Sequence, residues 1–312
     1  MERGEFQTAL AQMDSAIHRK PGFAPFYYTK GRLFEFLNQP DSAITIYEDA
    51  LKIKSHFPEV WSRLARLYLN RERYQKAVQI LKKLVDIQPD SSGNYLLLAE
   101  AYLYAGQPRL ALDQIQYYQK RGGDTLEVLR IKGLSFFTMK DYPKAVQLLE
   151  KYIQQKPNNY TVQKSLGIAY IQIGKLEKGI SHLNLAMSIK RDDPEIFLYR
   201  AQYFLKRGKI EDAREQIKFA TRLDSTNSLV LLEKGKFHLM VGDTATAEEA
   251  LQKGVRLNPQ CWLCYRYLGI ISQEQNRPLD ALRYFQTYME HIYTRDPEVE
   301  QRLKALRKTE GN

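Results

Sequence analysis

Apolar residues recur three or four positions apart along almost the whole chain, which is the spacing of one face of an α-helix. The first stretch shows this pattern clearly, because Phe6, Leu10, Met13 and Ile17 fall on one helical face and Pro21 ends it. No alternation of polar and apolar residues typical of β-strands accompanies it. The hydrophobic pattern therefore predicts an all-α chain.

The pattern repeats every 34 residues, and two columns of small residues keep this interval without insertion or deletion. The first column contains Ala9, Ala43, Ala77, Ala111, Ala145, Gly179, Ala213, Ala247 and Ala281. The second contains Gly31, Ala65, Ala99, Gly133, Gly167, Ala201, Gly235 and Gly269. An internal repeat of this length is typical of a solenoid, in which each unit packs only on its neighbours.

Each period predicts two helices joined by a tight turn. Complete units begin at Ala24, Pro58, Ser92, Leu126, Tyr160, Pro194, Ser228 and Trp262. The turn position contains residue types that tolerate a left-handed backbone, namely Gly106, Gly174, Gly208, Gly242, Asn38 and Asn276. Glu72 and Lys140 depart from this preference. We expect the small columns to face each other where paired helices approach closely, with larger aromatic residues interlocking around them in the core.

The period divides the chain into three parts. Residues 1–23 form a half repeat with only a second helix, residues 24–295 form eight repeats, and residues 296–312 form a C-terminal capping helix. Val299, Leu303 and Leu306 give this last helix a narrow apolar stripe. A bare second helix at the start would leave its apolar face uncovered, so we expect a truncated chain or a missing upstream segment.

The second unit carries the pattern best, with Trp61, Leu64, Ala65, Tyr68, Ala77 and Pro89. This pattern resembles the tetratricopeptide repeat, and the resemblance extends from residue 1 to about residue 295. It implies a right-handed superhelical solenoid of stacked antiparallel helix pairs, with a concave groove lined by the first helix of each pair. Members of that family are mostly scaffolds. The resemblance therefore implies a non-catalytic protein that captures a partner protein or peptide and helps to assemble a complex.

The composition changes this picture little. Hydrophobic residues make up 44% of the chain and charged residues 27%, as in ordinary globular proteins. The net charge of +11 is spread almost evenly over both halves, so no basic tail indicates a nucleic-acid partner. Acidic residues at position two of several units (Glu59, Glu127 and Glu195) would repel phosphate, and we do not expect RNA binding. No stretch approaches the ~18 consecutive apolar residues of a membrane span.

No motif for catalysis or cofactor binding is present. The five histidines form no HExxH pair, and neither a glycine-rich phosphate loop nor a GxSxG sequence occurs. The carboxylates are scattered over positions that face solvent rather than paired for acid–base work. We therefore expect no enzyme activity, no cofactor and no metal site.

Cys261 and Cys264 form a CxxC motif at the predicted start of a helix. Three interpretations remain for this pair: ordinary helix positions or an incidental disulfide, a redox-sensitive contact, and a metal ion shared between molecules. A helix N-terminus can favour the reactive thiolate, but thioredoxin-type motifs follow a strand, and none is predicted here. A zinc site would need two further ligands, and the chain has no other cysteine.

The concave groove is the candidate site. Positions two, five, nine and twelve of each unit lie on one side of the first helix, because they are three or four residues apart. Position twelve is mostly apolar, and positions five and nine add cations to it. The candidate residues are Tyr28, Arg32, Arg66, Glu100, Arg130, Phe137, Lys164, Ile171, Lys236 and Arg266. The alternative is that the position-twelve side chains pack against the next repeat.

Such a groove suits an extended or helical peptide with apolar anchors and some acidic residues. A clamp for a C-terminal carboxylate, as in co-chaperone members of the family, does not fit, because Ile168 rather than asparagine follows Lys164 by four residues. A second hypothesis makes the array a sensory or scaffolding region of a larger protein whose activity lies upstream. The two cysteines agree with the cytoplasm and with a bacterial periplasm or envelope, and nothing indicates the oligomeric state.

Overall fold

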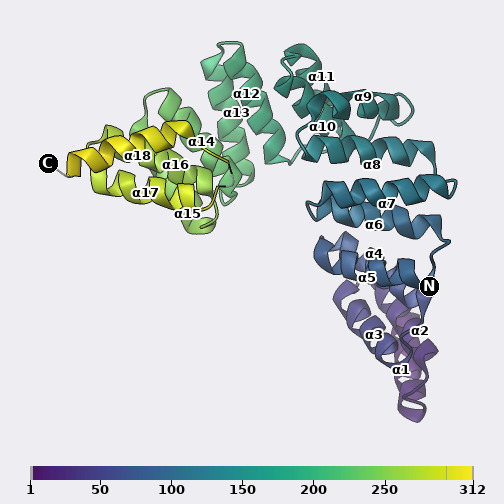
Figure 1. Ribbon diagram of the computed structural model, residues 1–312. Coiled ribbons are helices and arrows are strands. Elements are labelled where there is room, and N and C mark those ends of the chain that lie inside the picture. The colour runs from purple at the N-terminus through teal and green to yellow at the C-terminus, as the bar shows by residue number, and fades with distance from the viewer. Residues whose placement is uncertain (1–2, 293, 311–312) are drawn as a thin grey trace. The chain divides into compact units, whose positions relative to one another are not determined.

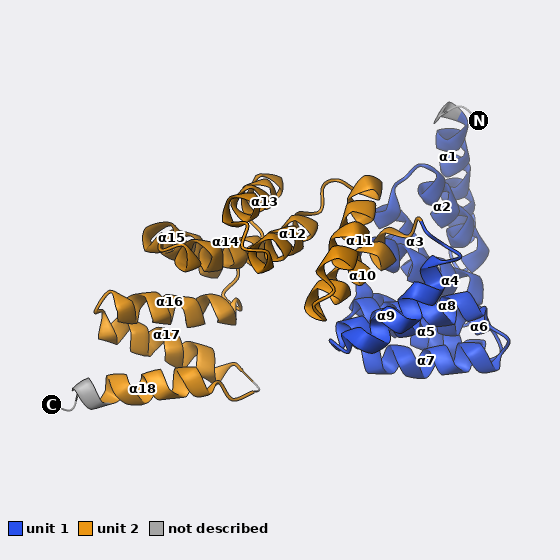
Figure 2. Cartoon of the chain, turned by 90° about the horizontal axis from the view of Figure 1, so that it is seen from above, with its two compact units in different colours: residues 1–157 blue, residues 158–312 orange. Residues whose placement is uncertain are grey.

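The computed structural model describes residues 3–292 and 294–310, and every regular element in these ranges is an α-helix (Figure 1). The chain divides into two compact units, residues 1–157 (unit 1) and residues 158–312 (unit 2), which Figure 2 distinguishes by colour. The boundary falls between the fourth and the fifth repeat. All-helical architecture, predicted from the hydrophobic pattern, is confirmed.

Unit 1 contains α1 (Arg3–Arg19), α2 (Ala24–Phe36), α3 (Pro40–Ile53), α4 (Pro58–Asn70), α5 (Tyr74–Ile87), α6 (Ser92–Tyr104), α7 (Pro108–Lys120), α8 (Thr125–Thr138) and α9 (Tyr142–Ile153). Unit 2 contains α10 (Tyr160–Gln172), α11 (Leu176–Ile189), α12 (Pro194–Lys206), α13 (Ile210–Leu223), α14 (Ser228–Met240), α15 (Thr244–Leu257), α16 (Trp262–Glu274), α17 (Pro278–Glu290) and α18 (Pro297–Glu310). The first helix of each pair begins at the predicted residue, except that the fourth begins one residue early, at Thr125.

Consecutive helices pack as pairs, and each pair stacks on the next one within its unit. The single helix α1 packs against α2, and the single helix α18 packs against α17, so both ends of the array consist of one helix beyond the complete pairs. Val299 and Leu306 of α18 are buried in a cluster with Phe285 of α17, as the apolar stripe predicts. That the chain lacks an upstream segment stays a prediction.

The columns of small residues lie where the paired helices touch, as expected. From Ala43 to Ala281 every member of the first column is buried. A methyl group added at Gly167 would lie 3.0 Å from the carbonyl oxygen of Gly179, so the backbones of α10 and α11 are almost in contact there. Small residues in these columns therefore set the distance between the helices of a pair.

The turn between the two helices of a pair has the same backbone in every repeat, including the two where the sequence departs from glycine or asparagine. Glu72 has a φ of 56° and Lys140 a φ of 62°, both in the left-handed region. At the second of these turns, Lys140 N–H donates to the carbonyl of Phe137, and Asp141 N–H donates to that of Phe136, both at 2.9 Å. The hydrogen bonds that end the helix thus impose the conformation whatever the side chain.

Replacing Lys140 by glycine is expected to stabilise unit 1 by up to about 1 kcal/mol, because glycine adopts the left-handed region without the steric cost of a Cβ. Urea unfolding followed by circular dichroism measures this change. The same substitution at Lys82, an exposed position inside α5, should instead destabilise the unit by up to about 1 kcal/mol. A change of the same sign in the free energy of unfolding of both variants would contradict this explanation.

Candidate partner-binding surface

Arg66 lies at the junction of two hollows in unit 1. It lies on the exposed side of α4 and forms no ion pair with any residue that the structure describes. Two adjacent hollows meet at its side chain, one of about 380 Å³ and one of about 310 Å³. We call this region the Arg66 surface and define it by Tyr28, Ser62, Arg66, Leu69, Leu97, Glu100 and Tyr104.

Both hollows have mixed polar and apolar walls. In the larger one, Glu59, Ser62 and Arg63 lie beside Arg66, together with Tyr28 and Pro58. Arg63 is engaged there, because its guanidinium pairs with Glu35 at 3.1 Å and donates to the hydroxyl of Tyr28 at 3.3 Å.

The smaller hollow has more aliphatic and aromatic side chains, since Leu69, Leu97, Tyr74 and Tyr104 line it beside Asn70 and Glu100. The rings of Tyr74 and Tyr104 are stacked with their centroids 5.4 Å apart, and Tyr104 is 43% exposed. An exposed cation thus lies beside a hollow with leucine and tyrosine walls, which suits a ligand with an acidic and an aromatic or aliphatic side chain close together.

Arg130, a second candidate on the same unit, is committed to internal ion pairs. Its guanidinium contacts the carboxylate of Glu100, from the preceding repeat, and that of Glu127 at 2.6 Å. Burial by itself lowers the pKa of Arg130, but the two carboxylates outweigh this effect and raise it. Only 13% of its side chain is exposed, so Arg130 joins neighbouring repeats rather than offering a free charge.

Unit 2 contains two bridges of the same kind. Lys164 Nζ lies 2.9 Å from the carboxylate of Asp193, which caps α12, and 2.8 Å from that of Glu195 in the first turn of α12, the first helix of the next repeat. Arg266 Nε lies 2.8 Å from the carboxylate of Asp296. The structure therefore places two of the predicted groove cations in bridges to an adjacent repeat and a third, Arg266, in a bridge to the capping helix. The sequence columns contained the signal, because each cation has a carboxylate about one period away.

The other candidates differ in how much surface they offer. Lys236 pairs with Glu233 at 2.6 Å and lines a hollow of about 200 Å³ in unit 2. Arg32 is exposed and lies over the ring of Phe36, and Phe137 is half-buried against Tyr142.

Ile171 is the one candidate that we remove from the proposed site. The inference from the sequence was wrong in counting it as groove surface, because its side chain is fully buried and offers a partner nothing to touch. This is the outcome expected if position-twelve side chains pack inside the array.

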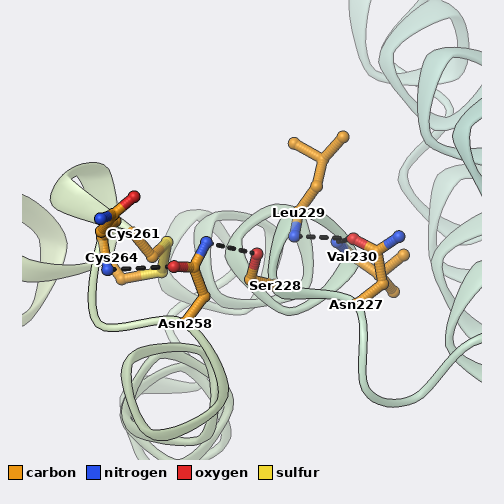
Figure 3. The surroundings of a disulfide bond; sticks show 8 residues. Asn227, Ser228, Leu229, Val230, Asn258, Cys261 and Cys264 are labelled. Carbon is orange, nitrogen blue, oxygen red and sulfur yellow. Dashed lines mark hydrogen bonds between the residues drawn. A yellow bond between two sulfur atoms is a disulfide. The ribbon is translucent and has the colours of Figure 1, made fainter. Parts of the chain in front are cut away.

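Cys261 and Cys264 are joined by a disulfide at the start of α16 (Figure 3). A disulfide was one of the interpretations left open by the sequence. Over the described ranges, 3–292 and 294–310, no group of three or more His, Cys, Asp and Glu side chains is placed to hold a metal ion. Within those same residues, no helix has both the length and the apolar character needed to cross a membrane.

Two curated proteins show which sequences this chain resembles. It is 25% identical over 204 residues to the human protein O-mannosyl-transferase TMTC1 and 23% identical over 228 residues to the BBSome complex member BBS4 of Bos taurus. These matches cover 64% and 73% of this chain, but only 23% and 44% of the relatives, so the chain spans less than half the length of either one.

Two solved structures share the fold. One is the APC/C hetero-tetramer Cut9–Hcn1, with a TM-score of 0.64 and 12% identity over 85% of this chain and 52% of that one. The other is the human IFIT1 dimer with PPP-AAAA, with a TM-score of 0.58 and 16% identity over 91% of this chain and 78% of that one. At such identities the likeness shows the fold alone.

Family models agree with the period that the sequence displays. One model described as tetratricopeptide repeat matches residues 37–95 and 136–203, and a second of the same description matches residues 96–160 and 198–260. Together they cover residues 37–260 without a gap. With the stacked helix pairs, the left-handed turns and the buried small-residue columns, these matches show that the chain belongs to the tetratricopeptide repeat family.

Proposed function

We propose that this chain is a non-catalytic scaffold that binds a partner protein or peptide through the Arg66 surface. Tetratricopeptide repeats generally bind proteins or peptides, and one relative is a member of the BBSome complex. The observation that carries the proposal is the exposed cation of Arg66, which forms no ion pair within the described part of the chain and lies where two hollows meet, one of them with leucine and tyrosine walls.

The same geometry limits the partner. Glu59 and Glu100 also line the hollows, and Arg130 neutralises only the second of them. A run of several acidic residues would meet the carboxylate of Glu59. The surface is therefore suited to a segment with one acidic residue, for Arg66, followed by an aromatic or aliphatic side chain for the hollow between Leu69 and Tyr104.

A displayed library of random peptides, selected on the immobilised full chain, tests this proposal. We expect the selected peptides to contain an acidic residue beside an apolar one and to bind more weakly at high salt. Arg66→Glu should weaken their binding at least about tenfold, because it reverses the charge that faces the acidic residue.

Arg109→Glu is the matched control, since Arg109 is an exposed arginine of the same unit on the second helix α7. It should bind as the wild type does. Equal affinity in Arg66→Glu and the wild type would refute the assignment. Arg130→Glu is not a useful variant, because it would add a third carboxylate beside Glu100 and Glu127.

A further inference from the structure

The disulfide of Cys261 and Cys264 lies at the junction of the last two repeats, where α15 ends and α16 begins. Cys261 is the residue that caps the N-terminus of α16, and Cys264 lies in its first turn. The two sulfur atoms differ in access: Cys264 is fully buried, whereas Cys261 is only half-buried. A reagent from solvent therefore reaches Cys261 first; Figure 3 shows the bonded pair and the side chains around it.

Cys261 replaces a capping residue of the other repeats in unit 2. The equivalent positions are Asn159, Asp193 and Asn227, and each side chain accepts a hydrogen bond from a backbone N–H of the first turn, at 2.8 to 3.0 Å. The side chain of Cys261 accepts no such bond. The N–H groups of Trp262 and Cys264 donate to the backbone carbonyls of Gln260 and Cys261, and no side chain caps α16. A negative charge on Cys261 would still be stabilised by the dipole at this helix N-terminus.

Cys264 replaces a buried aliphatic residue. The equivalent positions in unit 2 are Val162, Ile196 and Val230, all of them buried. Cys264 fills this place in a cluster with Leu232, Leu251 and Leu268. A methyl group added at Gly254 would lie 3.1 Å from Cys264 Sγ, so glycine leaves the space that the sulfur uses.

The disulfide closes a very short loop, since the two cysteines are only three residues apart. The stabilisation that a disulfide gives by restricting the unfolded chain grows with loop length, so it is small here. Other repeats build the same helix start with an Asn cap and a Val, as Asn227 and Val230 show. The fold therefore has little need of these sulfur atoms.

We propose that Cys261 and Cys264 form a thiol–disulfide exchange site that reacts with small thiols of the glutathione class. The incoming thiolate attacks Cys261 Sγ and forms a mixed disulfide, while the bond between the two cysteines breaks. Its electron pair stays on Cys264, which leaves as a thiolate and takes a proton from water. A second thiolate then attacks the sulfur of the bound small thiol and releases Cys261 as a thiolate at the start of α16.

The reaction is balanced in atoms and electrons. Two small thiols are oxidised to one small disulfide, and the protein disulfide is reduced by two electrons to a dithiol. In the reverse direction, a small disulfide oxidises the pair, with Cys261 attacking first. The stabilised thiolate of Cys261 serves both directions, because Cys261 is the leaving group in the last reductive step and the attacking thiolate in the first oxidative step.

The full-length chain, incubated with mixtures of reduced and oxidised glutathione and then alkylated, tests the proposal by mass spectrometry. We expect both cysteines to become reduced and reoxidised reversibly without denaturant. Cys264→Val should trap a mixed disulfide of glutathione on Cys261. The single thiol of Cys264→Val should also react with iodoacetamide at least about tenfold faster than that of Cys261→Asn, whose remaining thiol is buried.

The double variant Cys261→Asn, Cys264→Val separates exchange from structural support. It supplies the cap and the aliphatic residue of the preceding repeat, so its Tm should match that of the oxidised wild type. A disulfide that glutathione reduces only after urea has unfolded unit 2 would overturn the proposal. Equal alkylation rates in the two single variants would also overturn it, because they would show that neither thiol reacts preferentially.

Discussion

Replacing Gly269 by alanine is expected to destabilise unit 2 by about 2 kcal/mol, although alanine is the better helix former. A methyl group at this position would lie 2.6 Å from both Cδ1 and Cε1 of Phe285. That ring has no exposed surface and is enclosed by Ala281, Tyr288 and Val299. It cannot turn away, so α16 and α17 must separate or the ring must leave its preferred rotamer.

A second substitution should rescue the first. The second repeat has Ala65 and Leu81 at the two equivalent positions, and both are buried. Phe285→Leu alone is expected to cost about 1–2 kcal/mol, because it leaves a cavity. Combined with Gly269→Ala it should cost less than the sum, by at least about 1 kcal/mol.

Urea unfolding, together with hydrogen exchange of the α16 and α17 amides, measures the cycle. Gly93→Ala in α6 is the control, because no atom lies within 4 Å of the added methyl group, and this variant should be as stable as the wild type or slightly more so. Strictly additive effects of Gly269→Ala and Phe285→Leu would contradict the packing argument.

The fold was predictable from the sequence because it depends on local helix signals and on contacts between neighbouring helices. Helix boundaries follow from short-range signals, such as Pro58 and Pro194 in the first turn of their helices. The pairing of the helices follows from columns of small residues, which are buried where the two helices of a pair touch. Glu72 and Lys140 depart from the residue types that favour a left-handed backbone, yet both adopt it. The hydrogen bonds at the helix end fix the conformation of the turn, so residue preference alone does not predict it.

The site was predictable only in outline. Residue columns show which side chains share one face of a helix, and Arg66 was found in this way. They do not show which charges are already neutralised by the neighbouring repeat. Glu100 and Arg130 were predicted as separate groove residues, yet they form one ion pair. Ile171 has a periodicity that fits the groove and the core equally well, and only burial separates the two.

The ion pairs of Lys164 with Asp193 and Glu195 are expected to contribute strongly to the stability of unit 2. We expect Lys164→Met to destabilise unit 2 by about 2 kcal/mol at neutral pH, because it leaves the carboxylates of Asp193 and Glu195 without their cation. The cost should be below the ~3–5 kcal/mol of a fully buried pair, since 20% of the Lys164 side chain and 14% of that of Asp193 are exposed. Asp193 also keeps the hydroxyl of Tyr160 and the backbone N–H of Glu195 as donors.

The effect should depend on pH in a direction set by Asp193. Burial by itself raises the pKa of this carboxyl, but the hydrogen bonds of Tyr160 and Lys164 and the charge of Lys164 outweigh it and hold the pKa below the ordinary value of 3.8. An acid with a lowered folded pKa contributes stability that is fully present above its unfolded pKa and is lost as the pH falls through the folded value. The difference between wild type and Lys164→Met should therefore be constant above about pH 5 and shrink below about pH 4.

Lys218→Met is the matched control in the same unit, because Lys218 pairs with Glu215 while both side chains are 53% exposed. This variant should have the Tm of the wild type, since exposed ion pairs contribute little. Thermal unfolding of the three proteins between about pH 3 and 8 distinguishes the possibilities. A Lys164→Met variant as stable as Lys218→Met at pH 7 would show that the bridge does not hold neighbouring repeats together. Lys164 would then be available to a partner, as the sequence first suggested.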